Sequence, residues 1–200
     1  MATDQLEQQW GRLLHVKTTG RDDSNADLFK YPYEPTPYCV LERLASHGLV
    51  RKGNTLLDYG CGKGRVGFFM SHQTRCRSIG VECSEWTYRA AERNLETAVS
   101  RRRVALEMAN AEDFAVAPEV DRCFFFNPFS EKTLRKVLAN ILASWYGAPR
   151  EILLMFYYPS DEYLSVLMGQ PELEPVGEID CRDLFAGEDP RERIALFRLA

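Results

Sequence analysis

A turn rich in glycine and preceded by an acidic residue is the part of the sequence best suited to bind a ligand. An apolar run ends at Asp58, then Gly60, Gly62 and Gly64 follow at alternate positions, and an apolar stretch with helical spacing comes next. Glycine adopts positive φ without strain and lacks the Cβ that would keep a ligand from the backbone. The first turn of a helix offers unpaired N–H groups to a negative or polar group. We therefore expect a strand, a tight turn and a helix that together bind the polar end of a ligand.

The spacing of these glycines fits two classes of nucleoside cofactor. Residues 62–67 match the G-x-G-x-x-G pattern of dinucleotide-binding turns, whereas residues 58–64 place an acid before three alternating glycines. Asp58 favours the second pattern, because a carboxylate at a strand end accepts hydrogen bonds from a ligand ammonium group and would repel a pyrophosphate. With Asp58, the turn resembles motif I of the class I methyltransferases that depend on S-adenosylmethionine (SAM). The alternative is a turn without a ligand, although alternating glycines destabilise an element that does not use them.

A second acidic residue, Glu82, ends the next apolar strand. A carboxylate in this position accepts hydrogen bonds from both ribose hydroxyls in dinucleotide folds, so Glu82 fits either class of cofactor. The alternative is a surface acid stabilised by the macrodipole of the helix that follows. Cys83 comes directly after it and is expected to pack on the adenine face.

Asn110 and Ala111 follow the third strand, in a stretch that resembles the G-D-A-x-x-[LF] motif of SAM-dependent methyltransferases. The first polar side chain of that motif accepts a hydrogen bond from the adenine amino group. Asn110 stands at this position and Ala109 replaces the glycine, but an amide oxygen still accepts one hydrogen bond. Asp113 is a competing candidate for this role, and a helix-capping Asn110 is the structural alternative.

Asn127, Pro128 and Phe129 follow the fourth strand and resemble a shortened [DN]-P-P-[YF] motif of amino-group methyltransferases. The resemblance implies that the Asn127 side chain holds the target N–H and that the aromatic ring stacks on a planar substrate. Such positioning suits a reaction that needs little beyond a nitrogen lone pair aimed at a methyl carbon. The alternative is a helix start with Asn127 as N-cap and Pro128 at the first helical position, and both interpretations can hold together.

Alternating strands and helices position these residues. The expected strands are residues 55–59, 77–82, 104–108, 122–126, 151–157, 174–181 and 193–199; the helices between them are residues 65–72, 131–145 and 161–168, with another capped by Ser84. This order predicts a single α/β domain with a Rossmann-like doubly wound sheet, mostly parallel, with right-handed crossovers and an antiparallel last strand. Ligands bind such sheets at the carboxyl ends of the strands, so the four motifs should meet in one crevice.

The N-terminal part is expected to form a separate segment, residues 1–30, before the main domain of residues 31–200. Residues 4–15 have the apolar spacing of an amphipathic helix, and residues 17–27 are polar and rich in turn formers. Thr36 and Pro37 predict a helix start with Thr36 as the N-cap. The tyrosines and prolines of residues 31–38 are either a stiff lid over the cofactor or a rigid connector.

Composition excludes several classes of protein. The 200 residues carry a net charge of −4, which argues against a mainly electrostatic nucleic-acid binder, although the basic run of residues 101–103 leaves a local patch open. No apolar run could cross a bilayer, and the first residues lack the features of a secretory signal. The six cysteines form no C-x-x-C pair and no zinc-finger spacing. We therefore expect reduced thiols, no metal and a cytoplasmic protein.

The motifs together resemble a class I SAM-dependent methyltransferase over roughly residues 30–200. The resemblance implies SAM as cofactor, S-adenosylhomocysteine (SAH) as product, and methyl transfer to an acceptor that is a small molecule, a protein side chain or an RNA base. The residues expected to bind the cofactor are Asp58, Gly60, Cys61, Gly62, Gly64, Glu82, Cys83, Asn110 and Ala111, and the catalytic residues are Asn127, Pro128 and Phe129. The rival hypotheses are a non-catalytic SAM-binding module and a small NAD-dependent oxidoreductase, the latter disfavoured because no Tyr-x-x-x-Lys pair follows the fourth strand. The sequence leaves the oligomeric state open.

Overall fold

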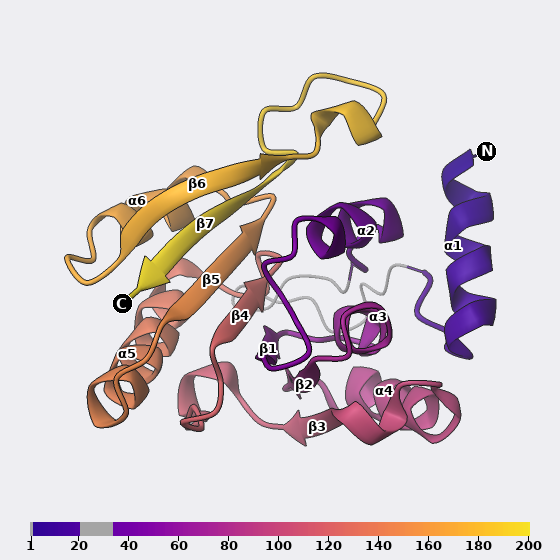
Figure 1. Cartoon of the computed structure of the whole chain (residues 1–200), viewed down its shortest axis with the longest axis horizontal. Helices are drawn as coiled ribbons and strands as arrows, with labels where there is room; N and C mark the ends of the chain where they lie inside the picture. Colours follow the sequence, from indigo (N-terminus) through magenta and orange to yellow (C-terminus); the bar gives the residue numbers. More distant parts are fainter. Residues whose placement is uncertain (1, 21–33) are drawn as a thin grey trace.

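A computed structural model describes residues 2–20 and 34–200 of the chain and shows one seven-stranded sheet covered by helices on both faces (Figure 1). The strands are β1 (Thr55–Tyr59), β2 (Arg77–Glu82), β3 (Val104–Met108), β4 (Arg122–Phe125), β5 (Ile152–Tyr157), β6 (Glu174–Asp180) and β7 (Arg193–Leu199). Their order in the sheet is β3-β2-β1-β4-β5-β7-β6. The first five strands pair in parallel, and β7 runs antiparallel to both β5 and β6. This confirms the predicted fold class.

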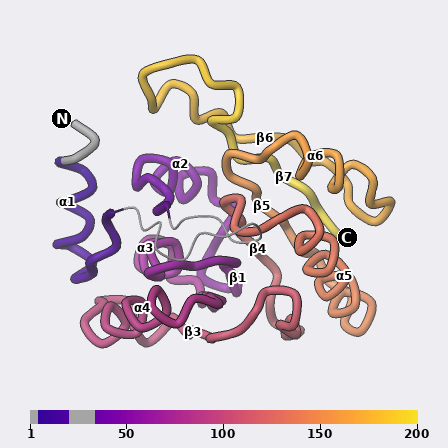
Figure 2. The backbone as a smooth tube through the Cα atoms, turned by 180° about the vertical axis from the view of Figure 1, so that it is seen from behind, coloured from indigo at the N-terminus to yellow at the C-terminus, as the bar shows by residue number. Residues whose placement is uncertain are grey.

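Helices divide between the two faces of the sheet. They are α1 (Ala2–Leu14), α2 (Tyr38–Ser46), α3 (Arg65–Gln73), α4 (Glu85–Thr97), α5 (Glu131–Gly147) and α6 (Asp161–Met168). One apolar core joins residues of α1 to α4 to one face, and a second core joins α5 and α6 to the other. Figure 2 shows α1 and α5 at opposite ends of the molecule, as Figure 1 does. The sheet therefore separates two cores and leaves the carboxyl ends of its parallel strands free for a ligand.

A row of stacked rings crosses the centre of the sheet on the α5 side. The rings of Tyr59 and Phe125 stack at 5.0 Å, and those of Phe125 and Phe156 stack at 4.4 Å. These residues come from β1, β4 and β5, which pair side by side. Offset stacking adds to the apolar area that each ring buries, so the row fixes β1 and β4 relative to each other just below the predicted site.

Three helices begin with a serine whose side chain accepts a hydrogen bond from a backbone N–H of the first turn, and the sequence analysis predicted one of these caps, Ser84. Ser84 caps α4, Ser130 caps α5 and Ser160 caps α6. The prediction for α2 is wrong by one residue: the N-cap is Pro37, whose side chain cannot cap, and Thr36 lies outside the helix. The N–H of Tyr38 instead donates to the Glu7 carboxylate at 3.0 Å, so α1 supplies the missing cap.

The N-terminal helix α1 packs on the domain through polar and aromatic contacts. Trp10 donates to Glu42 at 2.7 Å and packs edge-on against Phe69 at 4.8 Å. Glu7 binds the guanidinium of Arg65 at 2.5 Å. This ion pair is nearly buried, with the Arg65 side chain 3% exposed and Glu7 18% exposed. The chain before residue 20 is therefore fastened to α2 and α3 beside the predicted cofactor turn.

Part of the predicted N-terminal organisation falls outside the described residues. Residues 21–33 hold most of the predicted polar loop, the first part of the predicted lid and the boundary expected at residue 30. Within the described parts of the chain, no helix is long and apolar enough to cross a membrane. All six cysteines lie in these parts and are free thiols.

The ion pair between Glu7 and Arg65 gives a first prediction. Glu7→Ala leaves the Arg65 guanidinium buried without its carboxylate and removes the cap of α2. We expect the free energy of unfolding to fall by about 3 kcal/mol, as when one partner of a buried pair is removed. Urea denaturation measures it, with Glu96→Ala on the exposed face of α4 as the matched control. Equal stability of the two variants would contradict this role.

Candidate active site

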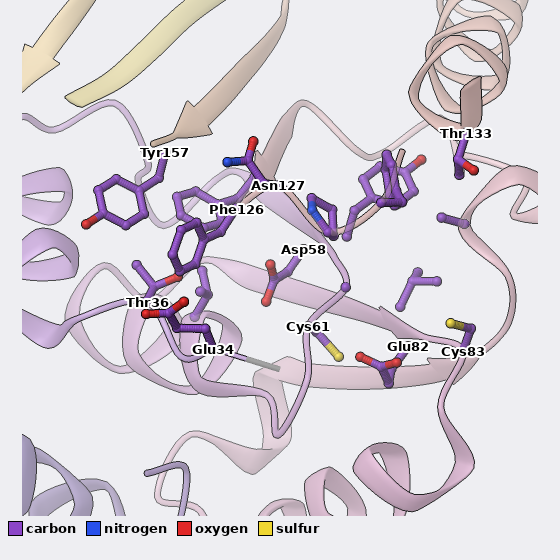
Figure 3. A pocket seen from close by; sticks show the side chains of 18 of the residues that line it. Glu34, Thr36, Asp58, Cys61, Glu82, Cys83, Phe126, Asn127, Thr133 and Tyr157 are labelled. Atoms are coloured by element: carbon purple, nitrogen blue, oxygen red, sulfur yellow. The ribbon is translucent and has the colours of Figure 1, made fainter. Parts of the chain in front are cut away.

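A cavity of about 830 Å³ opens at the carboxyl ends of β1, β2 and β4. Figure 3 shows Asp58 and Asn127 near its centre, with Glu82 and Cys83 on one side and Phe126 and Tyr157 on the other. Its lining includes the predicted residues Asp58, Gly60, Cys61, Glu82, Cys83, Asn110, Ala111, Asn127, Pro128 and Phe129. Gly62 and Gly64 belong to the same turn but lie outside this lining. The structure thus gathers the four motifs at one place.

The glycine turn has the backbone conformation that its sequence predicts. Gly60, Gly62 and Gly64 have φ values of 69°, 57° and 83°, in the left-handed region that favours glycine. A Cβ on Gly60 would overlap the Cβ of Pro128, so the turn after β1 touches the segment after β4. The N–H groups of Gly60 and Cys61 both donate to the Val81 carbonyl, at 2.9 and 3.0 Å. These contacts lock the turn between its two neighbouring strands.

Glu82 holds two backbone segments together at the end of β2. Its carboxylate accepts from the N–H of Gly62 at 3.0 Å and from the N–H of Ser84 at 2.8 Å. Because Ser84 caps α4, Glu82 also sits at a helix start as the structural alternative anticipated. A carboxylate has about four lone-pair positions, so two hydrogen bonds leave capacity for ribose hydroxyls.

Asp58 is buried with an unsatisfied oxygen. The residue is 3% exposed, and its Oδ2 has no hydrogen-bond partner among the described residues. Burial raises the pKa of Asp58 well above its usual value, and the nearby Glu82 carboxylate raises it further. An unpartnered buried carboxylate is costly unless a ligand completes it, so this oxygen marks a place for a donor or a cation.

Arg65 is a site residue that the sequence analysis did not select. It is 2% exposed and lines the cavity. Nε donates to Thr18 Oγ1 at 2.9 Å, Nη1 donates to Glu7 and to the Thr36 carbonyl, and Nη2 is buried with no hydrogen-bond partner among the residues that the structure describes. The sequence did contain a signal for this role. Arg65 stands in the first turn of a helix, where the macrodipole disfavours a cation, so its presence indicates an anionic partner nearby.

The remaining predicted cofactor residues lie around Glu82. Cys61 is buried against Gly80, and burial followed by the charge of Asp58 raises the pKa of its thiol. Cys83 and Asn110 are exposed on the cavity rim. Asn110 Nδ2 donates to Asp113 at 3.2 Å, and the side chain makes no cap hydrogen bond to the short helical turn that follows. Asp113, the other candidate for the contact with the adenine amino group, therefore orients the amide of Asn110.

Asn127 is held in a strained conformation with one oxygen unsatisfied. Its φ of 40° lies in the left-handed region, and its Nδ2 donates to the Tyr158 carbonyl at 2.5 Å. Its Oδ1 is buried without a partner among the described residues. The alternative of a helix cap is wrong, because α5 begins at Glu131 and Ser130 is its N-cap. Strained backbone maintained by its surroundings is a feature of functional sites.

Phe129 of the fourth motif is buried in the core, whereas Phe126, just before the motif, lines the cavity. Phe129 is 7% exposed and packs edge-on against Tyr59 and Phe125 in the core. Its backbone N–H donates to the Tyr163 hydroxyl, which in turn donates to its carbonyl at 2.5 Å. Phe126, which the sequence analysis did not assign, is half-buried and shares the cavity wall with Tyr157, the ring centroids 4.8 Å apart.

Comparison with known proteins agrees with the predicted family and fold. The model of a family described as a methyltransferase domain matches residues 56–145, which span all four motifs. No curated protein matches the sequence. The fold resembles an RNA methyltransferase from Salinibacter ruber solved with SAH, at 18% identity and a TM-score of 0.58, over 83% of this chain and 92% of that one.

Two further solved structures have the same fold. A TehB-like SAM-dependent methyltransferase from Corynebacterium glutamicum is 17% identical, with a TM-score of 0.58, over 99% of this chain and 97% of that one. A putative tRNA (m1A22) methyltransferase from Streptococcus pneumoniae is 18% identical, with a TM-score of 0.56, over 80% and 68%. Residues 56–145 therefore match a methyltransferase-domain family, and the sheet has the fold of these solved methyltransferase structures.

The contact between Gly60 and Pro128 gives a second prediction. Gly60→Ala places a Cβ against Pro128 and forces an L side chain into positive φ, which costs about 1–2 kcal/mol. We expect the variant to fold and to bind SAM at least about tenfold more weakly, equivalent to about 1.4 kcal/mol. Calorimetry measures the affinity, and Gly53→Ala, where open space surrounds the added Cβ, is the control. Unchanged affinity in Gly60→Ala would show that the turn does not position the cofactor.

Proposed function

We propose that this SAM-dependent methyltransferase transfers its methyl group to a nitrogen atom held by Asn127. The observation that carries the proposal is the buried Asn127 Oδ1, which lines the cavity and has no partner among the described residues. Bound SAM supplies an electrophilic methyl group on a sulfonium and leaves as SAH. An unsatisfied amide oxygen beside that group is suited to accept a hydrogen bond from an acceptor N–H.

Two buried, unsatisfied groups of opposite charge support SAM as the cofactor. Asp58 Oδ2 and Arg65 Nη2 both line the cavity beside the glycine turn. The methionine part of SAM carries an ammonium and a carboxylate, which match these two groups in charge. We assign the ammonium to Asp58 and the carboxylate to Arg65. A dinucleotide would instead place its pyrophosphate near the Asp58 carboxylate, so the NAD-dependent alternative is disfavoured.

The nucleoside part of the cofactor is assigned to the other side of the cavity. Glu82 has lone pairs left for the ribose hydroxyls after its two backbone contacts. Cys83, Asn110 and Ala111 line the rim beyond it and are proposed to surround the adenine. Gly60 and Cys61 supply the backbone between the two parts. This assignment gives a role to each predicted cofactor residue that lines the cavity.

Asn127 is proposed to act by position. Its Nδ2 is fixed on the Tyr158 carbonyl, so the amide cannot rotate and Oδ1 keeps one direction. When Asn127 Oδ1 accepts a hydrogen bond from the acceptor N–H, the lone pair of that nitrogen points in a defined direction toward the methyl carbon. Methyl transfer depends on this alignment more than on acid–base chemistry. Pro128 fixes the segment against Gly60, and Phe129 anchors it in the core, so both act as positioning residues in this proposal.

The burial of Asp58 predicts how SAM binding depends on pH. The ammonium binds the charged carboxylate, so SAM affinity should fall as pH decreases through the raised pKa of Asp58. Asp58→Asn should remove that dependence and weaken SAM by about 1.5–3 kcal/mol. Calorimetry over a pH series measures both effects, with Glu107→Gln on exposed β3 as the control. Parallel pH profiles for Asp58→Asn and the native protein would contradict the assignment.

The same carboxyl predicts a change in stability. Because its folded pKa lies above the unfolded value of about 3.9, Asp58 lowers the stability of the ligand-free protein as pH rises above that value. Asp58→Asn should therefore raise the melting temperature at pH 7 while it weakens SAM. A loss of both stability and affinity would indicate a structural role.

Replacement of Asn127 tests the acceptor assignment. Asn127→Gly keeps the left-handed backbone conformation and removes only the amide, so we expect kcat to fall by roughly a hundredfold, about 2.7 kcal/mol, with SAM affinity nearly unchanged. Asn127→Asp keeps an oxygen and should retain more activity. Turnover is measured by SAH release. Full activity in Asn127→Gly would overturn the proposal, whereas SAM binding without turnover on any acceptor would favour the non-catalytic binding module.

A further inference from the structure

One end of the cavity combines acidic and aromatic side chains. Glu34, Phe126, Tyr157 and Glu192 line it, and we call this group the acceptor end. Figure 3 shows Glu34, Phe126 and Tyr157 grouped on the side away from Glu82. We infer that the acceptor end binds an aliphatic amine, positively charged at neutral pH, as the methyl acceptor. The inference rests on the proposed nitrogen methylation and specifies its substrate class.

Glu192 reaches the acceptor end from the segment before β7. The Tyr157 hydroxyl donates to its carboxylate at 2.6 Å, and the Tyr157 ring packs against Phe126. Burial raises the pKa of Glu192, and the charges of Asp189 and Glu34 raise it further, while the Tyr157 hydrogen bond and Arg191 lower it. The carboxylate is thus oriented by Tyr157 and lies close enough to Glu34 to feel its charge.

The nearest cation of this segment is already neutralised. Arg191 donates to Asp189 at 3.1 Å and to the Tyr158 hydroxyl at 2.6 Å, and its guanidinium lies 4.3 Å from the centre of the Tyr158 ring. Neither Glu34 nor Glu192 forms an ion pair within the described parts of the chain. Among residues 2–20 and 34–200, these two carboxylates of the acceptor end therefore have no ion-pair partner.

Two of the three described basic side chains that line the cavity form ion pairs, and the third lies away from the acceptor end. Arg65 binds Glu7, and Lys136 on α5 binds Glu112 at 3.1 Å. Lys132 comes from the first turn of α5, next to Thr133, which Figure 3 shows on the side opposite Tyr157. The acceptor end therefore repels a phosphate-bearing acceptor and attracts a cation. The rings of Phe126 and Tyr157 add cation–π attraction for an ammonium group.

An alkylammonium must lose a proton before its nitrogen can accept a methyl group. In our assignment the Glu192 carboxylate takes that proton as one N–H bond breaks, and Asn127 Oδ1 accepts a hydrogen bond from one of the two remaining N–H groups. The nitrogen lone pair forms the N–C bond while the C–S bond of the sulfonium breaks and its electron pair stays on sulfur. The products are a methylated ammonium ion and a neutral thioether. Atoms and charge balance, and Glu192 then returns its proton to water.

A binding experiment tests the inference without turnover. The protein saturated with SAH is titrated by calorimetry with benzylamine, benzyl alcohol and benzoate, which share a ring and differ in charge. We expect benzylamine to bind at least tenfold more tightly than benzyl alcohol, and benzoate not to bind. Glu192→Gln and Glu34→Gln should each lower benzylamine affinity at least tenfold with SAH affinity unchanged. Glu188→Gln, an exposed residue of the same segment outside the cavity lining, is the matched control and should change neither affinity.

A methyl-transfer assay identifies the source of the amine. It also separates failure of this inference from failure of the proposed function. SAH release is measured with benzylamine, a lysine-containing peptide and an RNA transcript; transfer to either amine supports the inference and identifies the source as small or peptide-borne. The inference is overturned if only the RNA is methylated, or if Glu192→Gln binds benzylamine as tightly as the native protein does. Neither result overturns the proposed nitrogen methylation. Failure of the protein to bind SAM would instead overturn the proposed function itself.

Discussion

The close contact between the turn after β1 and the segment after β4 is the constraint on which the site depends. Gly60 has no Cβ, so Pro128 can sit directly against its backbone. The two strands are neighbours in the sheet, and their stacked rings fix their spacing below the turn. Asp58 precedes this contact and Asn127 follows it on the other strand. The residue proposed to bind the cofactor ammonium and the residue proposed to hold the acceptor thereby line the same cavity.

In the proposed cofactor site, buried charged groups without partners lower the stability of the ligand-free protein and are completed by the bound cofactor. Asp58 Oδ2 and Arg65 Nη2 each lose their water without gaining a partner from the described residues. Arg65 is tolerated because Glu7, Thr18 and the Thr36 carbonyl satisfy its other nitrogens. These three partners come from α1 and from the chain segments on either side of residues 21–33. The N-terminal helix therefore contributes to the cofactor site through the side chain that it holds.

The sequence predicted the sheet closely because its signals are local. Apolar runs that end in an acidic residue beside a turn place β1 and β2 at the residues where the structure has them, and the spacing of apolar residues places β3. The acceptor end could not be predicted in this way. Glu192 meets Tyr157 across the β5–β7 pairing, and no periodic pattern connects the two residues. The sequence left Asn127 with two interpretations, a residue that holds the acceptor and a helix N-cap. The structure excludes the second, because Ser130 is the N-cap of α5.

The arrangement of charges in the cavity suits the direction in which charge moves during transfer to an amine. Positive charge leaves the sulfur and develops on the nitrogen, away from the Asp58 side and toward the acceptor end. A preorganised acceptor dipole and a carboxylate at that end stabilise the developing charge more than they stabilise the neutral amine. Asn127 Oδ1 and Glu34 can fill these roles while Glu192 carries the proton. In this proposal the acidic end of the cavity therefore favours an acceptor nitrogen, which becomes positively charged, over an acceptor oxygen or carbon that ends neutral, both in binding and at the transition state.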